Sequence, residues 1–413
     1  MPKRILSRHA LPGNARTLFR VRGDLAALAL VLMGLCLAGC RGKRGAIDRI
    51  TENGVEVVLN HLEPYQTSAR GTSLRLEEVA AVDTENDSVA KAGVTDIYLF
   101  DVDSRGNIYI VVPPAHPGTA VFKLSPEAAP LLSFGRMGQG PFELEYPSGL
   151  HIDAGDRVSV LESPKSKYHT YDPSGRPLVE ASPEGGFEDL VLLHNGTLLV
   201  SRLEKGDLKG KYLAMTTGLY SEDFRLRREI DRFTSYPNRA IFDKVPGRYV
   251  CGTDYVFMAT ASAGRIFAGN SDRGYEILVY DLDGRPIRKI RKQYNPVPVS
   301  MDYQKEILKR YTSSMPEFAA KIYFPANWHP FQSFIPDDQG RLFVVTYEPG
   351  KAPGEFLWDI FDPDGAFIGR MSLSVARPRF GQMLARVRGD RLYAVQEKPN
   401  GFKRLTVYRM VWK

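Results

Sequence analysis

The stretch LFDVDSRGNIYIV (99–111), followed by TAVFKLSPEAAPLLSF (119–134), decides the fold of this chain. Apolar and polar residues alternate along it, which is typical of half-buried β-strands. Gly106 centres a turn between the first two strands, where a tight hairpin needs a positive φ. The stretch therefore predicts a small antiparallel meander of three or four strands with two apolar faces to cover.

The same pattern recurs along the rest of the chain. The shorter spacings between its turn glycines, 41 and 49 residues, match a four-stranded propeller blade of about 40–50 residues. Such a unit cannot bury both faces alone, so neighbouring units must stack. The six copies occupy residues 99–134, 149–180, 190–230, 256–290, 333–373 and 383–413, with turn glycines Gly106, Gly155, Gly196, Gly264, Gly340 and Gly389.

Six units predict an all-β chain that forms a six-bladed β-propeller with one short inserted helix. Closing the ring removes exposed sheet edges, which otherwise invite aggregation. The last strand, LTVYRMVW (405–412), needs a partner, which we expect from residues 54–59 or 74–81. Apolar residues at helical spacing, with Ser300 as the N-cap, predict the inserted helix over residues 301–312.

The N-terminus differs from the repeats. A basic leader precedes an almost wholly apolar run, residues 25–37, which leads into LAGC (37–40). This order is typical of a secretory signal. With Ala38 and Gly39 the apolar run has about 15 residues, fewer than the roughly 20 that span a bilayer. An uncleaved transmembrane anchor is the alternative.

The tetrad LAGC resembles the bacterial lipobox. The resemblance implies that Cys40 carries a diacylglycerol group and becomes the first residue of the mature protein. Several acyl chains anchor a protein stably where one does not. We therefore expect a signal peptide over residues 1–39, a membrane tether over 40–52 and the propeller over 53–413. Arg41 follows Cys40, and no Asp lies there to suggest inner-membrane retention, which favours the outer membrane, facing the periplasm or the cell surface.

Charge and cysteine content narrow the class of protein. The net charge of the chain is +7, and the signal contributes +5 of it, which leaves about +2. A nucleic-acid-binding protein would keep a clustered basic surface, so we expect no nucleic-acid partner. Cys251 is the one thiol left after export and acylation, so no disulfide forms within a chain. We expect a monomer.

One segment, FGRMGQGPFELEYPSGLHID (134–153), resembles the NHL-type repeat in its Gly-rich turn, its Phe and its Pro-x-Gly entry to an inner strand. Together with the lipobox it is similar to the six-bladed β-propeller lipoproteins. Related propellers include scaffolds, carbohydrate- and peptide-binding proteins, lactonases and a zinc-dependent lyase. The resemblance therefore implies the fold and leaves the function open.

A propeller commonly binds ligands where its innermost strands begin, at the mouth of the central channel. Convergent carboxylates and a histidine there could hold Ca²⁺ or a polar ligand. Alternatively, these side chains could form hydrogen bonds only to channel water and to loop backbone. The candidate channel-mouth residues are Asp96, Ser148, Asp189, Asp254, His329 and Gln332. We assign no catalytic residue, no metal ligand and no cofactor, apart from this open option of Ca²⁺.

Two other clusters have a structural and a functional interpretation. His151, His194 and His329 could hold zinc, but their different distances from the turn glycines imply different depths in the channel. Trp328, Phe331 and Phe334 could stack on a sugar or grip a peptide, and such residues also build blade cores.

The sequence favours a lipid-anchored envelope propeller that binds a ligand or serves as a protein-interaction scaffold. Its partner would be a peptide, a carbohydrate or an envelope protein. The alternative is a metal-assisted hydrolase or lyase with its site at the channel mouth. A third hypothesis is a structural member of an envelope complex. Neither GxSxG nor HExxH occurs in the chain.

Overall fold

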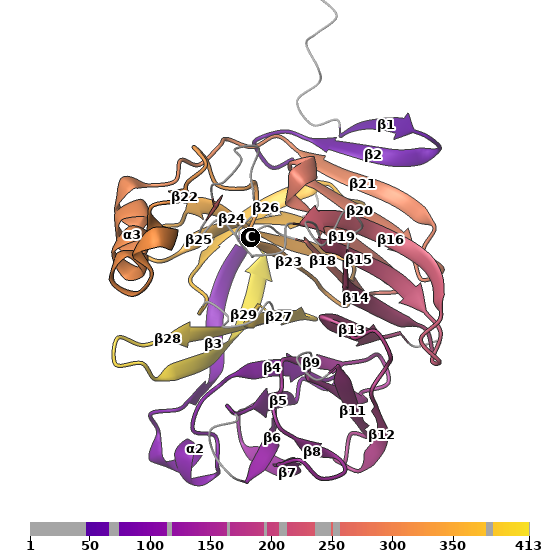
Figure 1. Cartoon of the computed structure of the whole chain (residues 1–413), viewed down its shortest axis with the longest axis vertical. Coiled ribbons are helices and arrows are strands. Elements are labelled where there is room, and N and C mark those ends of the chain that lie inside the picture. Colours follow the sequence, from indigo (N-terminus) through magenta and orange to yellow (C-terminus); the bar gives the residue numbers. More distant parts are fainter. Residues whose placement is uncertain are drawn as a thin grey trace, which may run out of the picture. The chain divides into compact units, whose positions relative to one another are not determined.

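The computed structural model describes residues 47–65, 74–113, 118–162, 166–193, 196–205, 213–235, 249–250, 257–376 and 383–412 (Figure 1). The predicted signal peptide, the predicted tether up to residue 46 and the residues Cys40, His194, Cys251 and Asp254 lie outside the described residues. The compact unit that contains the β-sheets begins at Ile47.

Six main sheets follow one another along the chain, and each runs outward from an inner strand. Blade 1 consists of β4 (Leu99–Val102), β5 (Ile108–Val111), β6 (Thr119–Leu124), β7 (Pro130–Met137) and the short β8 (Glu143–Leu144). Blade 2 consists of β9 (Gly149–Ile152), β10 (Val158–Glu162), β11 (Lys167–Tyr171) and β12 (Pro177–Ala181). Blade 3 consists of β13 (Asp189–Leu192), β14 (Leu198–Lys205), β15 (Leu213–Tyr220) and β16 (Leu226–Ser235).

Two of the other three blades, blades 4 and 6, recruit N-terminal strands. Blade 4 consists of β18 (Phe257–Ser262), β19 (Arg265–Asn270), β20 (Glu276–Asp281) and β21 (Pro286–Lys292), with β2 (Val55–Asn60) and β1 (Asp48–Glu52) outside them. Blade 5 consists of β23 (Ser333–Pro336), β24 (Leu342–Pro349), β25 (Phe356–Phe361) and β26 (Phe367–Leu373). Blade 6 consists of β27 (Ala385–Arg388), β28 (Arg391–Glu397), β29 (Lys403–Trp412) and β3 (Leu74–Asp83).

The inner strands close a ring, which confirms the six-bladed propeller. Strand β4 contacts both β9 and β27, while β23 contacts both β18 and β27. Blades 2, 3 and 4 join through contacts of β10 with β13 and of β14 with β18. Apolar side chains fill each seam; Trp358, for example, is fully buried with residues of blades 5 and 6. Fully burying such a side chain contributes about 2–3 kcal/mol.

Aspartates stabilise the turns that connect consecutive strands within the blades. Asp103 Oδ1 accepts hydrogen bonds from the backbone N–H groups of Arg105 and Asn107, and Gly106 takes a positive φ of 82° between them. Blade 2 keeps this geometry, because Asp153 Oδ1 accepts hydrogen bonds from the N–H groups of Gly155 and Arg157. Asp156 (φ 61°), and not the expected Gly155, occupies the left-handed position. Aspartate is one of the few residues besides glycine that adopt this conformation.

The chain ends close the ring together. Strand β3 pairs antiparallel with β29 in a register that runs from Leu74 opposite Trp412 to Asp83 opposite Arg404. This confirms 74–81 as the closing segment. Residues 54–59 do not close blade 6, because β2 pairs in parallel with β21 and extends blade 4.

The inserted helix is confirmed as α3 (Met301–Ser314), whose N-cap Ser300 accepts a hydrogen bond from Tyr303 N. Ile307 is its buried residue. The prediction of a single helix was wrong, because the short helices α2 (Asp87–Lys91), η2 (Ser271–Arg273) and α4 (Pro316–Ala319) are also present. A two-residue parallel pair, β17 (Tyr249–Val250) with β22 (Ile322–Tyr323), completes the described elements. None of the helices described is long and apolar enough to cross a bilayer.

Candidate functional site

Four charged or titratable side chains come from the innermost strands of blades that adjoin in the ring. They are Asp101 on β4, His151 on β9, Asp189 on β13 and Arg386 on β27. All four are partly exposed, whereas the alternate residues of these strands are mostly buried in the seams between blades. These side chains are the polar, partly exposed groups of the innermost strands, which surround the channel of the ring.

Asp101 joins three blades. Its Oδ1 accepts a hydrogen bond from Arg386 Nε at 2.9 Å, and its Oδ2 accepts one from the backbone N–H of Ile152 at 2.9 Å. Val102 N also donates to Oδ1. Arg386 lies over the ring of Phe100, 5.6 Å from its centroid. The carboxylate of Asp101 is thus well satisfied, and it fastens blades 6, 1 and 2 at the channel wall.

Asp189 keeps an open oxygen. Its Oδ1 lies 2.9 Å from His151 Nε2 and accepts a hydrogen bond from Leu190 N, whereas no described residue donates to Oδ2. The side chain of Asp189 is 46% exposed and that of His151 is 18% exposed. Of the two partners, the carboxylate therefore meets the solvent of the channel and the imidazole belongs to the wall.

The surroundings of Asp189 favour its charged form. Burial among the protein groups around the channel raises its pKa, but the His151 ring, the Leu190 N–H and the charge of Arg386 outweigh that effect and hold the pKa below its usual value of 3.8. Asp189 is therefore ionised at neutral pH. An ionised, half-exposed carboxylate with a free oxygen binds a hydroxyl, an amine or another donor.

Most of the other predicted channel-mouth residues serve the blades themselves. Asp96 pairs with Lys403 Nζ at 2.9 Å and caps Ile97 N. Ser148 N donates to Leu161 O, and Gln332 Nε2 donates to Thr346 O at 2.6 Å. His329 lies just before β23 and is partly buried.

The described part of the chain does not bring together a set of ligands for either of the two metal sites considered, Ca²⁺ at the channel mouth or zinc on three histidines. It contains no group of three or more His, Cys, Asp or Glu side chains placed to hold a metal ion. His151 is engaged with Asp189 instead. The aromatic cluster divides, because Phe331 and Phe334 are buried in the core between blades 4 and 5. Trp328 lies outside that core, stacked on Tyr347 at 4.6 Å between centroids.

The NHL-like segment is held onto blade 2 by two glutamates. Glu162 Oε1 accepts hydrogen bonds from the backbone N–H groups of Glu145 and Tyr146 at 2.6 and 2.7 Å, and Glu180 accepts one from Phe142 N. His169, fully buried, places Nε2 2.9 Å from Glu162 and Nδ1 3.5 Å from Glu180. Burial raises the pKa of Glu180, but the N–H of Phe142 and the charge of Lys167 lower it overall. This cluster fixes the path by which the chain enters β9 and so positions His151.

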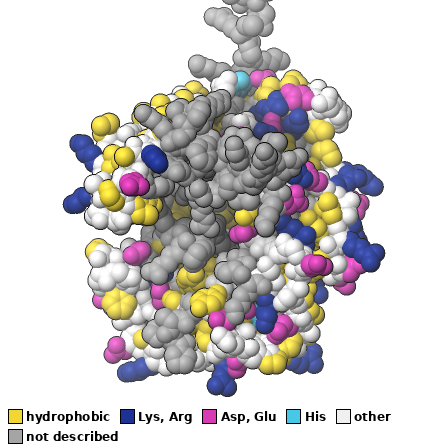
Figure 2. Space-filling model, viewed as in Figure 1, with side chains coloured by type: hydrophobic (Ala, Val, Ile, Leu, Met, Phe, Trp, Pro, Cys, Tyr) yellow, Lys and Arg dark blue, Asp and Glu magenta, His cyan; other side chains and the backbone are white. Residues whose placement is uncertain are grey.

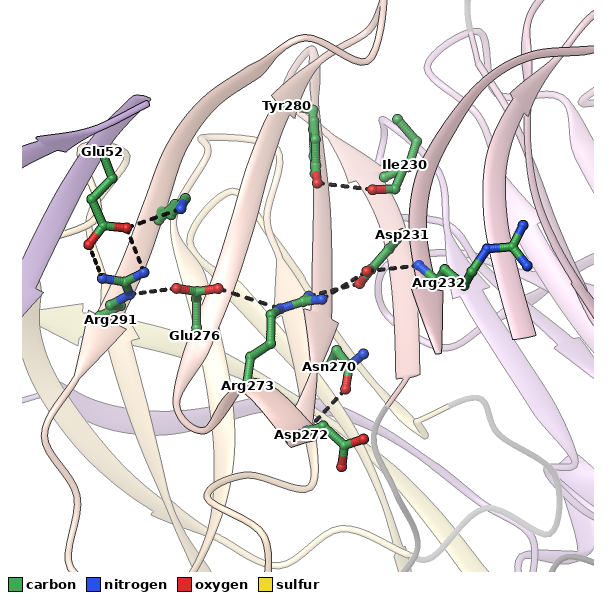
Figure 3. Close-up of polar contacts among 11 residues, drawn as sticks. Glu52, Ile230, Asp231, Arg232, Asn270, Asp272, Arg273, Glu276, Tyr280 and Arg291 are labelled. Carbon is green, nitrogen blue, oxygen red and sulfur yellow. Dashed lines mark hydrogen bonds and ion pairs between the residues drawn. The ribbon is translucent and has the colours of Figure 1, made fainter. Parts of the chain in front are cut away.

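A second polar network lies at the rim and links the N-terminal hairpin to blades 4 and 3 (Figure 3). Arg291 bonds to Glu52 at 2.5 and 2.8 Å and to Glu276 at 2.5 Å. Arg273 continues the series, 3.4 Å from Glu276 and 2.8 Å from Asp231. Hydrogen bonds from Arg291 and Lys289 lower the pKa of Glu52 to about 2. Because every charge in the series has an opposite neighbour, the network joins the strands.

The surface seen in Figure 2 has no broad field of one sign. Lys and Arg side chains are interspersed with Asp and Glu side chains over the described part of this face. The open carboxylate of Asp189 in the channel is therefore more distinctive than any charge pattern on this face.

Sequence comparisons find no matching family model and no matching curated protein. The chain resembles several solved structures at low identity. A candidate exported protein from Bacteroides fragilis is 13% identical with a TM-score of 0.49, covering 86% of this chain and 99% of that one. A gluconolactonase from Xanthomonas campestris is 11% identical with a TM-score of 0.42, covering 90% and 98%. Virginiamycin B lyase from Staphylococcus aureus is 10% identical with a TM-score of 0.38, covering 82% and 100%. These similarities concern the fold and assign no activity.

Proposed function

We propose that this protein is a lipid-anchored envelope propeller that binds a small donor-bearing ligand in its central channel. The observation that carries the proposal is Asp189, whose 46% exposed carboxylate is oriented through Oδ1 and has no donor at Oδ2 among the described residues. Carbohydrate hydroxyls and the ammonium group of a peptide or amine are the donors that such a carboxylate binds best.

The exposure of the His151–Asp189 pair favours binding over acid–base catalysis. A catalytic histidine needs its imidazole toward the substrate and its carboxylate behind it. Here the order is reversed, with the carboxylate more exposed than the imidazole. A carboxylate with a lowered pKa is also a weak base at neutral pH, because an efficient base has a pKa near the working pH.

A screen of the full chain tests the proposal. Thermal unfolding would be followed with neutral sugars, amino sugars, free amino acids and short peptides, and the hits confirmed by calorimetry. Asp189→Asn should weaken each confirmed ligand about tenfold or more, because a charge-assisted hydrogen bond contributes about 1.5–3 kcal/mol. Asp283→Asn, which removes a carboxylate 67% exposed at a rim turn, should leave binding unchanged. Ligands that bind both variants and the unaltered chain equally would refute the role of Asp189.

A hydrolase or lyase is the second candidate, because His151 and Asp189 do form a histidine–carboxylate pair at 2.9 Å. Metal analysis of the purified chain, together with turnover assays on the screened ligands, separates the two functions. Turnover that Asp189→Asn abolishes, with one metal ion bound per chain, would replace the binding hypothesis by the enzymatic one.

Acylation at Cys40 supplies the anchor in this proposal. The basis is the sequence LAGC (37–40) after a basic and apolar leader. Metabolic labelling with an alkyne fatty acid should mark the chain, and Cys40→Ser should remove the label and release the protein from the membrane fraction. Membrane retention of Cys40→Ser would favour an uncleaved anchor.

A further inference from the structure

The chain between the proposed lipid and the ring is short. Seven residues, 41–47, follow Cys40 before strand β1 begins at Asp48. A chain extends at most about 3.5 Å per residue, so Ile47 lies within about 25 Å of the acylated cysteine. This limit comes from covalent geometry alone. It holds the start of β1 close to the bilayer surface.

The same seven residues carry only positive charge. Arg41, Lys43 and Arg44 are basic, and the segment has no acidic residue. Basic residues beside a lipid anchor are drawn to anionic headgroups, by about 1 kcal/mol for each Lys or Arg near the surface. The charge of the segment therefore adds an electrostatic attraction to an anionic membrane beside the proposed lipid.

Strand β1 is firmly joined to the ring through the hairpin that it forms with β2. Glu52 on β1 bonds to Arg291 and Lys289 of blade 4, and Glu56 on β2 bonds to Arg288 at 2.6 Å. Strand β2 also pairs in parallel with β21 from Arg288 to Lys292. The hairpin cannot swing away from blade 4 without breaking these bonds.

A third set of contacts continues the attachment to blade 5. Asn60, 2% exposed, accepts a hydrogen bond from Phe367 N and donates to Gly365 O and Arg291 O. Tyr65 N donates to Phe367 O. These bonds attach the hairpin to blade 5 as well as to blade 4, so holding the hairpin at the membrane also holds the propeller there.

We infer that the rim of blade 4, formed by β1 and β2, faces the lipid bilayer. Both strands lie at the circumference of the ring, outside β21 (Figure 1). Ile50 of β1 is 44% exposed and is the apolar side chain that β1 offers to the interface. The channel then runs alongside the membrane, and both of its mouths open to solvent. This inference rests on the proposed acylation of Cys40.

Two single-cysteine chains test the orientation. Cys251→Ser removes the remaining thiol, and Ile50→Cys or Leu131→Cys then adds one. Leu131 is a matched control, because it is 53% exposed on the outer strand of blade 1, opposite blade 4 in the ring. Each acylated chain would carry a bimane label in vesicles of phosphatidylethanolamine and phosphatidylglycerol with nitroxide headgroups.

The inference predicts that the label at residue 50 is quenched at least three times as strongly as the label at residue 131. In vesicles without nitroxide headgroups both labels should stay bright. Equal quenching, or stronger quenching at residue 131, in a membrane-bound chain would overturn the orientation and leave the acylation intact. A chain that stays soluble with Cys40 present would overturn both.

Discussion

His151 and Asp189 lie 2.9 Å apart on neighbouring blades, and the carboxylate is the partner that faces the channel. The imidazole therefore orients the acid. This arrangement gives the channel one fixed negative group, and it makes the pH dependence of ligand binding predictable.

Ligand affinity through Asp189 should stay constant as the pH falls from 7 to about 5 and should decline only below about pH 4. The reason is that the pKa of Asp189 is held below 3.8, so the carboxylate stays ionised until the solution is strongly acidic. The ionised carboxylate of Asp189 also stabilises the fold. That contribution to the free energy of unfolding is fully present above the ordinary pKa of 3.8 and is lost as the pH falls through the lowered pKa. Calorimetric titrations across this range measure the effect. A midpoint above pH 5 would show that another group controls binding.

Replacing His151 should weaken binding through the position of Asp189. His151→Ala removes one of the two donors at Oδ1 and leaves Leu190 N, so the carboxylate is held less firmly and affinity should fall about three- to tenfold. His151→Gln keeps an amide donor near the same place and should restore most of the loss. The carboxyl ¹³C shift of Asp189, measured with the affinity, distinguishes repositioning from general unfolding. Equal affinities for both variants and the unaltered chain would remove His151 from the site.

A buried threonine without a partner offers a test of the packing between blades. Thr406 is fully buried, and its hydroxyl makes no hydrogen bond to any described residue. Thr406→Val should therefore leave the free energy of unfolding unchanged or raise it by up to about 1 kcal/mol. Chemical denaturation followed by tryptophan fluorescence measures the change.

Thr346 is the matched control for that variant. It is 1% exposed, and its hydroxyl donates to Leu357 O at 2.8 Å. Thr346→Val should lower the free energy of unfolding by about 1–2 kcal/mol. If Thr406→Val costs as much as Thr346→Val, the hydroxyl of Thr406 has a partner that stabilises it.

Asn60 should be a sensitive point of the N-terminal attachment. Asn60→Ala removes three hydrogen bonds and leaves the N–H of Phe367 and the carbonyl of Gly365 buried without that partner. We expect a loss of about 2–4 kcal/mol and faster hydrogen exchange in β2. Asn400→Ala, at an exposed turn where the side chain bonds to Glu85, should cost less than about 1 kcal/mol. Equal losses for the two variants would contradict the attachment.

The sequence predicted the ring well because its signals are local. Alternating strands and turn residues identified all six blades, and Ser300 marked the start of α3. The shift from Gly155 to Asp156 was missed, since either residue suits a turn and only the backbone shows which one is left-handed. The parallel pairing of β2 with β21 has no local signature, because its partners lie more than 200 residues apart.

The channel was predictable only in part. Asp189 was predicted as a channel-mouth residue from its place at the start of an inner strand, and its binding role stays a prediction; the structure shows which groups contact its Oδ1. Its partner His151 was considered as a zinc ligand, because its periodicity placed it on an inner strand without showing its neighbour. The contact between Asp101 and Arg386 joins residues 285 positions apart, and it depends on ring closure.

The most direct test of the account is the affinity of Asp189→Asn for a ligand that the full chain binds. Calorimetry on the unaltered chain, on Asp189→Asn and on Asp283→Asn supplies the comparison. The account predicts at least a tenfold loss for Asp189→Asn, with the other two chains within twofold of each other. An affinity for Asp189→Asn equal to that of the unaltered chain would contradict the claim that this channel carboxylate recognises the ligand.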